Sequence, residues 1–363
     1  MQPLYVGSSS SHSGKNLVCL GLGRRFLDDG LRLAFMKPFG TSPLRVGRDY
    51  TDSDAWMIVE ELGLGQTPEE ACPVVRTQDL VALSLRHQAS GLLGVIRAAC
   101  AGLARGRDLL LLAGSGTLAS GAMSGISGHT LVKELQARVV LVDRYENQHF
   151  LDNLLCTRDR LGPALLGVVM NSVDPEMAGA LEERVLPFLA AEGIACLGRL
   201  PKDEVLGSLA VQSLVEMLGA KVLTGAKQAG RLVTRFFIGA MQVSHAHKFF
   251  GGVRDFGCIV GGDRPDIQLA ALEGGAACLI LTGNLYPSEI ILSRAEELEV
   301  PVLVVRDDTY GVAHRLERLR LTSSLRTPEK IARAQELVAA SLDFAALYAG
   351  LGLKPYTKLR SNE

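Results

Sequence analysis

Short, unbroken runs of apolar residues recur along the first half of this chain, and they limit the folds that it can adopt. The runs lie at residues 33–36, 109–112, 139–142 and 165–170. Each is too short for a buried helix and lacks the alternation of a strand with one face in water. Strands that are buried on both faces of a parallel sheet have this pattern, and segments with helical spacing separate them. The sequence therefore predicts an α/β fold built on a parallel sheet.

The same pattern starts again near residue 258. Predicted strands and helices alternate there at residues 258–260, 265–273, 278–281, 287–299 and 302–305. Both predicted helices have Pro at or near the start, where its missing N–H costs nothing. This is a complete βαβαβ unit of its own. We therefore predict a larger first domain at residues 1–207, a smaller α/β domain at 208–325 and a helical tail at 326–363.

The segment between the first strand and the first helix has the composition of a phosphate loop. Residues 7–16 read Gly-Ser-Ser-Ser-Ser-His-Ser-Gly-Lys-Asn. In such a loop, backbone N–H groups and the helix N-terminus form a positive concave site, and the lysine neutralises phosphate charge. The alternative is a serine-rich turn that binds nothing. On the first interpretation, the nucleotide-binding residues are Gly7, Ser11, Ser13, Gly14, Lys15 and Asn16.

Four segments together resemble dethiobiotin synthetase and, in particular, the dethiobiotin-synthetase-like domain at the N-terminus of long phosphate acetyltransferases. They are the loop, Lys37-Pro38, Asp52-Ser53-Asp54 and residues 108–116. The resemblance extends over roughly residues 1–225. It implies a P-loop domain that binds ATP or another nucleotide, with Lys15 and Lys37 as catalytic residues at the phosphates. It also implies that Asn171 binds the adenine edge and that Asp52 and Asp54 bind Mg²⁺.

Two positions depart from that family at the magnesium site. The Ser or Thr that normally follows the loop lysine is Asn16, and the family's Glu-Gly pair is Ala113-Gly114. Alanine offers no oxygen and asparagine only a neutral carbonyl, whereas Mg²⁺ requires well-placed oxygens that are preferably charged. The sequence therefore predicts a nucleotide site with impaired magnesium binding.

Several of these side chains also have a simpler interpretation. Asp52 and Asp54 are typical of an acidic helix N-terminus that faces solvent. Lys37 is also typical of a surface lysine that closes a strand, and Asn171 of a turn residue after one. The sequence alone leaves these alternatives open.

Residues from about 208 to 320 resemble the DRTGG domain, a module of long phosphate acetyltransferases and of some pyrophosphatases. The matching segments are residues 239–241, 262–267 and 281–284. Asn284 replaces the final glycine of the motif, and Asn is tolerated where a positive φ is needed.

Three residues of this second domain follow predicted strands, at the sheet edge where open α/β sheets bind ligands. They are Asp263, Arg264 and Thr282, and we expect an effector site or an interface there. Arg264 is suited to a planar carboxylate or phosphate. The alternative is that Asp263 caps the helix at 265–273 while Arg264 pairs with Asp266.

Composition narrows the range of partners. The net charge of −1 gives no general attraction for nucleic acid or an anionic membrane, and no apolar run has the length of about 18 residues that a membrane span needs. The seven cysteines contain no CxxC pair, which favours a reducing cytoplasm. We expect a cytoplasmic homo-oligomer whose ligand is a nucleotide or a small acyl metabolite.

The long phosphate acetyltransferases have an acyltransferase domain after the DRTGG domain, whereas this sequence ends at Glu363. We therefore expect no acetyl phosphate synthesis from this polypeptide alone. The favoured function is a nucleotide-binding regulatory or metabolite-sensing protein. One alternative is an active ATP-dependent enzyme of the dethiobiotin synthetase type, which activates a carboxylate by phosphoryl transfer. A purely structural interaction module is the other.

Overall fold

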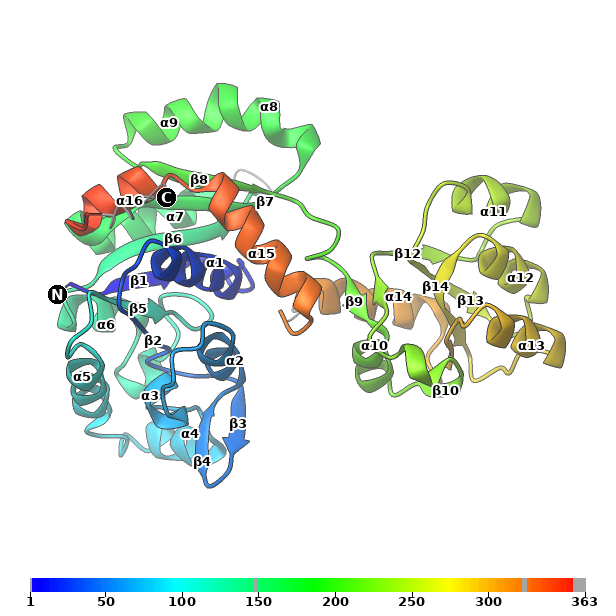
Figure 1. Ribbon diagram of the computed structural model, residues 1–363, viewed down its shortest axis with the longest axis horizontal. Helices are drawn as coiled ribbons and strands as arrows, with labels where there is room; N and C mark the ends of the chain where they lie inside the picture. Colours follow the sequence, from blue (N-terminus) through cyan, green and yellow to red (C-terminus); the bar gives the residue numbers. More distant parts are fainter. Residues whose placement is uncertain (1, 146–148, 322–324, 355–363) are drawn as a thin grey trace, which may run out of the picture. The chain divides into compact units, whose positions relative to one another are not determined.

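The computed structural model describes residues 2–145, 149–321 and 325–354 (Figure 1). The chain forms two compact units. Unit 1 comprises the chain up to Lys202 together with the segment from Lys330 onward, and unit 2 comprises Asp203–Glu329. From Lys330 onward, the helical tail predicted at 326–363 is therefore grouped with the first unit. Each unit has its own hydrophobic core and is described by itself.

A parallel sheet with the strand order β2-β5-β1-β6-β7-β8 forms the centre of unit 1. Its strands, in chain order, are β1 (Leu4–Gly7), β2 (Leu33–Met36), β5 (Leu109–Ala113), β6 (Arg138–Arg144), β7 (Leu165–Val173) and β8 (Cys196–Pro201). Every residue of β1, β2 and β5 is buried. The prediction of a parallel sheet with strands buried on both faces is confirmed. A hairpin of β3 (Pro43–Val46) and β4 (Asp49–Asp52) stands apart from this sheet, and the pattern of apolar runs did not predict it.

Helices cover both faces of this sheet (Figure 1). Those before the tail are α1 (Lys15–Asp28), α2 (Ser53–Glu61), α3 (Pro68–Ala71), α4 (Gln78–Leu85), α5 (Leu92–Leu103), α6 (Gly128–Glu134), α7 (His149–Leu161), α8 (Ala178–Ala180) and α9 (Leu186–Ala191). Leu110 and Leu112 of β5 belong to a core shared with α5, α6 and α7. Since side chains alternate along a strand, Leu109 and Leu111 face the other side of the sheet.

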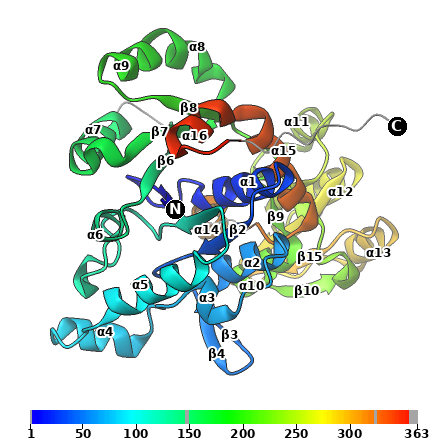
Figure 2. The same cartoon turned by 60° about the vertical axis from the view of Figure 1, so that its left-hand side comes forward.

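The last two helices, α15 (Pro328–Ser341) and α16 (Phe344–Leu351), pack on α1 and β8 (Figure 2). Gly21 of α1 permits the close approach of α15, because a Cβ there would lie 2.3 Å from the Cβ of Val338. The ring of Phe26 contacts Phe344 edge to face at 6.4 Å between centroids. This packing explains why the tail belongs to unit 1.

A second sheet, in the order β10-β15-β14-β13-β12, forms the centre of unit 2. Its strands are β10 (Lys221–Thr224), β12 (Arg235–Ile238), β13 (Phe256–Gly261), β14 (Ala276–Thr282) and β15 (Val302–Val304), and β9 (Leu209–Ala210) pairs with β11 (Leu232–Val233). The helices are α10 (Val211–Leu218), α11 (Val243–Phe250), α12 (Pro265–Glu273), α13 (Glu289–Glu297) and α14 (Thr309–Leu321). Only β10 runs antiparallel to its neighbour. The predicted βαβαβ unit is confirmed as β13-α12-β14-α13-β15.

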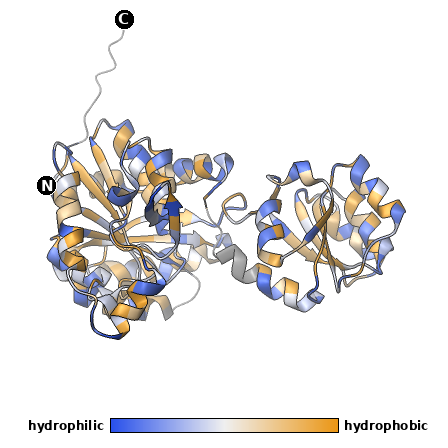
Figure 3. Cartoon of the chain, turned by 90° about the horizontal axis from the view of Figure 1, so that it is seen from below, coloured by the Kyte–Doolittle hydropathy of each residue, from blue (hydrophilic) through white to orange (hydrophobic). Residues whose placement is uncertain are grey.

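Apolar residues lie along the strands of both sheets (Figure 3). Within the described residues, no helix combines the length and the apolar character that a membrane span requires.

Candidate functional site

The segment after β1 folds as the sequence predicts, with α1 beginning directly at Lys15. Gly14 has a φ of 99°, and a Cβ at this position would lie 2.1 Å from Nδ2 of Asn171. Both the backbone conformation and the available space therefore require glycine here. The loop brings Lys15 to the carboxyl edge of the parallel sheet, which is the usual ligand edge of open α/β sheets.

Lys15 is 8% exposed and has no carboxylate partner among the described residues. Its Nζ donates to Ser8 Oγ at 2.8 Å and to the Gly116 carbonyl at 2.5 Å. Burial lowers the pKa of Lys15 to about 8, against a smaller opposing effect of the Asp143 charge. A nearby anion would therefore stabilise the charged form of this buried ammonium group.

The second half of the loop presents unsatisfied polar groups. In the described parts of the chain, nothing accepts a hydrogen bond from the backbone N–H of Ser13, Gly14 or Lys15. The Ser13 hydroxyl is fully buried and also lacks a partner. Buried donors without acceptors cost free energy until a ligand or water satisfies them. The arrangement suits an anion at the start of α1.

The first half of the loop is held by Asp143, a residue that the sequence interpretation missed. This fully buried carboxylate lies near the end of β6. It accepts hydrogen bonds from the N–H groups of Ser9 and Ser10, each at 3.1 Å, and from Ser10 Oγ at 2.9 Å. Burial raises the pKa of Asp143, although these hydrogen bonds oppose the rise. The available signal was an acidic residue directly after the predicted strand at 139–142.

Lys37 forms a buried ion pair beside the loop. Its Nζ lies 2.8 Å from Asp52 Oδ1 and 3.3 Å from Asp54 Oδ2. Burial alone would lower the pKa of Lys37, but the charges of Asp52 and Asp54 raise it above its ordinary value. Lys37 is only 4% exposed, so the interpretation as a surface lysine is wrong.

The carboxylate of Asp52 is fully buried and saturated with hydrogen bonds. Its five donors are Lys37 Nζ and the backbone N–H groups of Thr41, Ser42, Asp54 and Ala55. A carboxylate has roughly four lone-pair directions, so none is left over. Asp52 does cap α2, but the interpretation in which it faces solvent is wrong.

The other residues predicted near the metal offer few oxygens. Asp54 is 27% exposed and contacts Lys37. Ala113 ends β5 and is buried, and Asn16 lies in the first turn of α1 with partial exposure. Across the described residues, no cluster of three or more His, Cys, Asp or Glu side chains is arranged to hold a metal ion.

Asn171 lies under the loop rather than in a turn. It belongs to β7, which continues to Val173, and it is 8% exposed. Its Nδ2 donates to the Ser13 carbonyl at 2.8 Å. The interpretation as a turn residue is wrong, and the role at the adenine edge stays a prediction. Of the remaining loop residues, Gly7 is buried at the end of β1, whereas Ser11 is exposed.

In unit 2, the predicted residues lie at or just after the carboxyl ends of the neighbouring strands β13 and β14. Thr282 ends β14, is 4% exposed and has its Oγ1 2.9 Å from Oγ1 of Thr309. Arg264 donates to both oxygens of Asp266 at 3.0 Å and to the Met241 carbonyl at 3.1 Å. The predicted pairing of Arg264 with Asp266 is confirmed.

Asp263 does not cap the following helix. Arg264 occupies the N-cap position of α12, without a side-chain capping bond, and the Asp263 side chain is exposed. The alternative in which Asp263 is the cap is therefore wrong: Asp263 lies one residue before the N-cap position, and Pro265 has no N–H to donate to its carboxylate. Asn284 has a φ of 55°, as expected for the position that replaces a glycine.

Comparison with known proteins agrees with the two units. Residues 2–209 match the family described as "AAA domain", and residues 213–319 match the DRTGG domain. The phosphate acetyltransferase of Synechocystis sp. (strain PCC 6803) is 27% identical over 356 residues, which cover 94% of this chain and 50% of that protein. The phosphate acetyltransferase of Pseudomonas putida (strain KT2440) is 27% identical over 389 residues, which cover 97% of this chain and 52% of that protein. The chain thus spans about half the length of the curated relatives it matches.

Among solved structures, cobyrinic acid a,c-diamide synthase from Mycobacterium smegmatis with a bound ATP analogue and magnesium covers 56% of this chain and 85% of its own, with 15% identity and a TM-score of 0.35. The match to the CBS and DRTGG domains of Clostridium perfringens pyrophosphatase, in complex with diadenosine tetraphosphate, covers 40% of this chain and 70% of that one. The identity is 15% and the TM-score is 0.28. The resemblance to the phosphate acetyltransferases that the sequence predicted is confirmed by the sequence relatives and the two family matches.

Proposed function

The chain belongs to the AAA-domain family that its residues 2–209 match, with a DRTGG domain after it, and on that premise we propose that it is a regulatory or metabolite-sensing protein. It binds ATP or another nucleotide at residues 7–16 with little help from magnesium. The DRTGG domain supplies the effector site or the interface through which binding is reported.

One observation carries the nucleotide site. A buried lysine without a carboxylate partner lies beside free backbone N–H groups and the orphaned Ser13 hydroxyl. A phosphate group satisfies all of these together, since it supplies both negative charge and acceptor oxygens. Lys15, Ser13 and Gly14 are therefore the central binding residues, and Gly7, Ser11 and Asn16 complete the loop around them.

The residues present fit a magnesium ion poorly. Asp52 uses its lone pairs on five donors, and Ala113 has no oxygen to offer. Asp54 keeps a partly exposed carboxylate, and it forms an ion pair with Lys37. One monodentate carboxylate and a neutral amide are a weak ligand set for a cation that dehydrates reluctantly.

In the DRTGG domain, Asp263, Arg264 and Thr282 form the proposed effector or interface edge. The Arg264 guanidinium binds the Asp266 carboxylate at the surface, and an incoming planar anion replaces Asp266 as its partner. An association surface on this small unit favours a symmetric homo-oligomer, since two-fold dimers are the commonest assembly.

A thermal-shift titration tests the nucleotide site. ATP in EDTA stabilises a protein that binds it by about 2.7 kcal/mol at a hundredfold excess over Kd. We expect this shift in the wild type and in Arg24→Ala, which removes an exposed charge of α1 that pairs with Asp28. We expect no shift in Lys15→Ala. A shift that survives Lys15→Ala, or none in the wild type, rejects the site.

An ATP-dependent enzyme is the second candidate, and one observation favours it. Lys15 and Lys37 are both buried at the same sheet edge, close enough that the charge of Lys37 lowers the pKa of Lys15. Two cations so placed suit phosphoryl transfer, which depends on positioning and charge stabilisation. Release of ADP by the purified chain, lost in Lys37→Met, separates this candidate from a sensor that binds without turnover.

A further inference from the structure

A second region of unit 1 has unsatisfied positive groups, at the opposite edge of the sheet from the phosphate loop. A cavity of about 810 Å³ lies there, beside α6, the end of α7 and the first residues of β6. Arg138 opens β6, whereas Asp143 lies near its other end. Because the strands are parallel, the cavity and the phosphate loop are at separate edges.

The charges that line this cavity are all positive. Lys133, Arg138 and Arg160 contribute to its wall, and no Asp or Glu does. Within the described residues, none of these three side chains forms an ion pair, whereas other arginines of unit 1 do, among them Arg24, Arg25, Arg32, Arg97, Arg158 and Arg199. The region therefore has a local excess of positive charge without an internal counter-ion.

Two buried polar atoms in the same wall have no partner. Nδ1 of His129 and Nε of Arg138 are inaccessible and make no hydrogen bond in the described parts of the chain. Burial, with the nearby charge of Arg160, lowers the pKa of His129. Unsatisfied buried nitrogens cost free energy, so the protein's own hydrogen bonds do not fully stabilise this wall.

We propose that this cavity binds a phosphate monoester with a small apolar body. A phosphate monoester carries nearly two negative charges, which matches three unpaired cations better than a single carboxylate does. Arginine binds phosphate with two parallel hydrogen bonds. Val132 and Leu161 supply apolar wall for the rest of the ligand, and the volume lies within the usual range for small-molecule sites.

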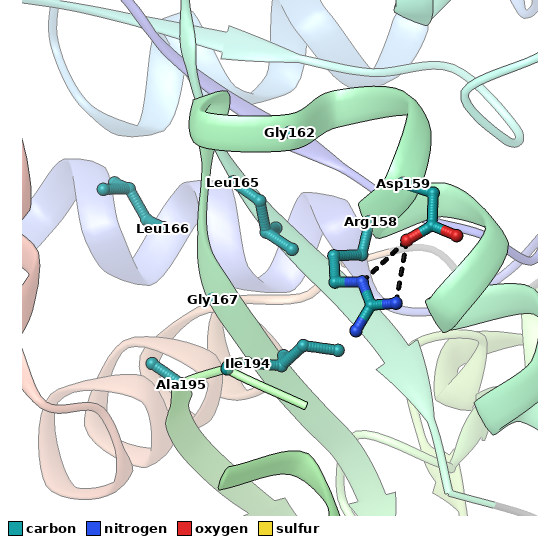
Figure 4. Close-up of a pocket in the computed structure, with 9 residues that line it drawn as sticks. Arg158, Asp159, Gly162, Leu165, Leu166, Gly167, Ile194 and Ala195 are labelled. Carbon is teal, nitrogen blue, oxygen red and sulfur yellow. Dashed lines mark hydrogen bonds and ion pairs between the residues drawn. The ribbon is translucent and has the colours of Figure 1, made fainter. Parts of the chain in front are cut away.

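A smaller cavity of unit 1 contains an arginine whose charge is balanced by carboxylates of the protein. Arg158 lines this cavity of about 380 Å³, and its guanidinium binds the carboxylate of Asp159 (Figure 4). The same guanidinium also binds the carboxylate of Glu192. Its charge is neutralised by the protein, so an anion gains little there. Arg158 is therefore a matched control for Arg138.

One segment connects the proposed site to the phosphate loop. Ala119 and Ala122 line the cavity, while the Leu118 N–H donates to the Ser8 carbonyl at 3.0 Å and the Gly116 carbonyl accepts from Lys15. A ligand in the cavity thus contacts the same segment that supports the loop, which suits an effector of nucleotide binding.

The test titrates the full-length chain with phenyl phosphate in a calorimeter, with phenol as the neutral counterpart. We expect phenyl phosphate to bind and phenol not to. Arg138→Met and Arg160→Met each weaken binding about tenfold, whereas Arg158→Met and Lys15→Ala leave the affinity within about twofold. Fluorescence of Trp56 verifies that each variant is folded, and Arg160 is exposed enough to be replaced without disturbing the core.

Three results overturn the proposal: no binding of phenyl phosphate, wild-type affinity in both Arg138→Met and Arg160→Met, or loss of binding in Lys15→Ala. The last of these places the probe in the phosphate loop instead. Failure here leaves the nucleotide site untouched, because that site is read out by ATP and by Lys15→Ala.

Discussion

The carboxyl edges of the two sheets carry similar residues in different environments. In unit 1, Asp52 and Asp143 are fully buried, and each accepts several hydrogen bonds from the backbone of a neighbouring loop. In unit 2, Asp263 is exposed, and Arg264 and Asp266 form a surface pair only two residues apart. The chemistry of the side chains is alike, but only the first edge keeps charges out of water.

That difference shows which sheet edge is held in one fixed arrangement by the fold. Burying a charge is costly unless the surrounding structure supplies partners, so the loops around Asp52 and Asp143 must hold one arrangement. An exposed ion pair contributes little and is easily rearranged. We infer that unit 1 carries the preorganised site, whereas the edge of unit 2 adapts to whatever binds it.

The largest effect is expected for Asp52→Ala. It leaves Lys37 buried with only Asp54 and removes the acceptor of four backbone N–H groups, so unit 1 should lose about 3–5 kcal/mol. Urea unfolding followed by the single tryptophan, Trp56 in α2, measures this loss. Asp54→Ala is the control and should cost much less, because Asp54 is partly exposed. Equal losses in the two variants would break the comparison.

Asn171→Ala comes next. It removes the donor of the Ser13 carbonyl, and an unsatisfied buried carbonyl costs about 1–3 kcal/mol. The same Trp56 transition reports it. If the loop is already mobile enough to find another donor, unfolding will be unchanged, and the loop is less preorganised than we infer.

A pH titration sharpens the comparison further. Lys15 has a pKa of about 8 in the free protein, and a bound phosphate raises it, so binding takes up a proton above pH 8. Affinity for ATP should therefore fall as pH rises, by about tenfold between pH 7 and pH 9. Lys15→Arg stays charged throughout and should bind with a flat profile. A flat wild-type profile would mean that Lys15 does not contact the ligand.

The smallest effect is expected for Arg264→Ala. Its pair with Asp266 is at the surface, so hydrogen exchange of the β13 and β14 peptides should be unchanged in the free protein. Faster exchange along either strand would show that this edge is as preorganised as the first one.

Much of the fold could be predicted from the sequence, because its signals are local. The strand at 33–36 and the helix at 265–273 were predicted at their observed bounds, because unbroken apolar runs and a leading proline are local signals. The hairpin β3–β4 was missed because β3 is largely exposed and has no apolar pattern. The Arg264–Asp266 pair was predicted because its partners are neighbours in sequence.

Only part of the candidate site could be predicted from the sequence. The loop and Lys15 follow from a contiguous motif, but Asp143 reaches Ser9 across 134 positions and Asn171 reaches Ser13 across 158. Such contacts depend on the strand order of the sheet, in which β1 lies beside β6 and β6 beside β7. Likewise, nothing local predicted that Asp52 would be saturated by the backbone of residues 41–42.

Calorimetric titration of ATP into the purified chain, once in EDTA and once in excess magnesium, tests the central claim most directly. The account predicts binding under both conditions, with Kd values within about threefold of each other, because the loop and Lys15 supply the contacts. Binding that requires magnesium, or that tightens about a hundredfold with it, would contradict the account and show that an intact magnesium site forms around the nucleotide.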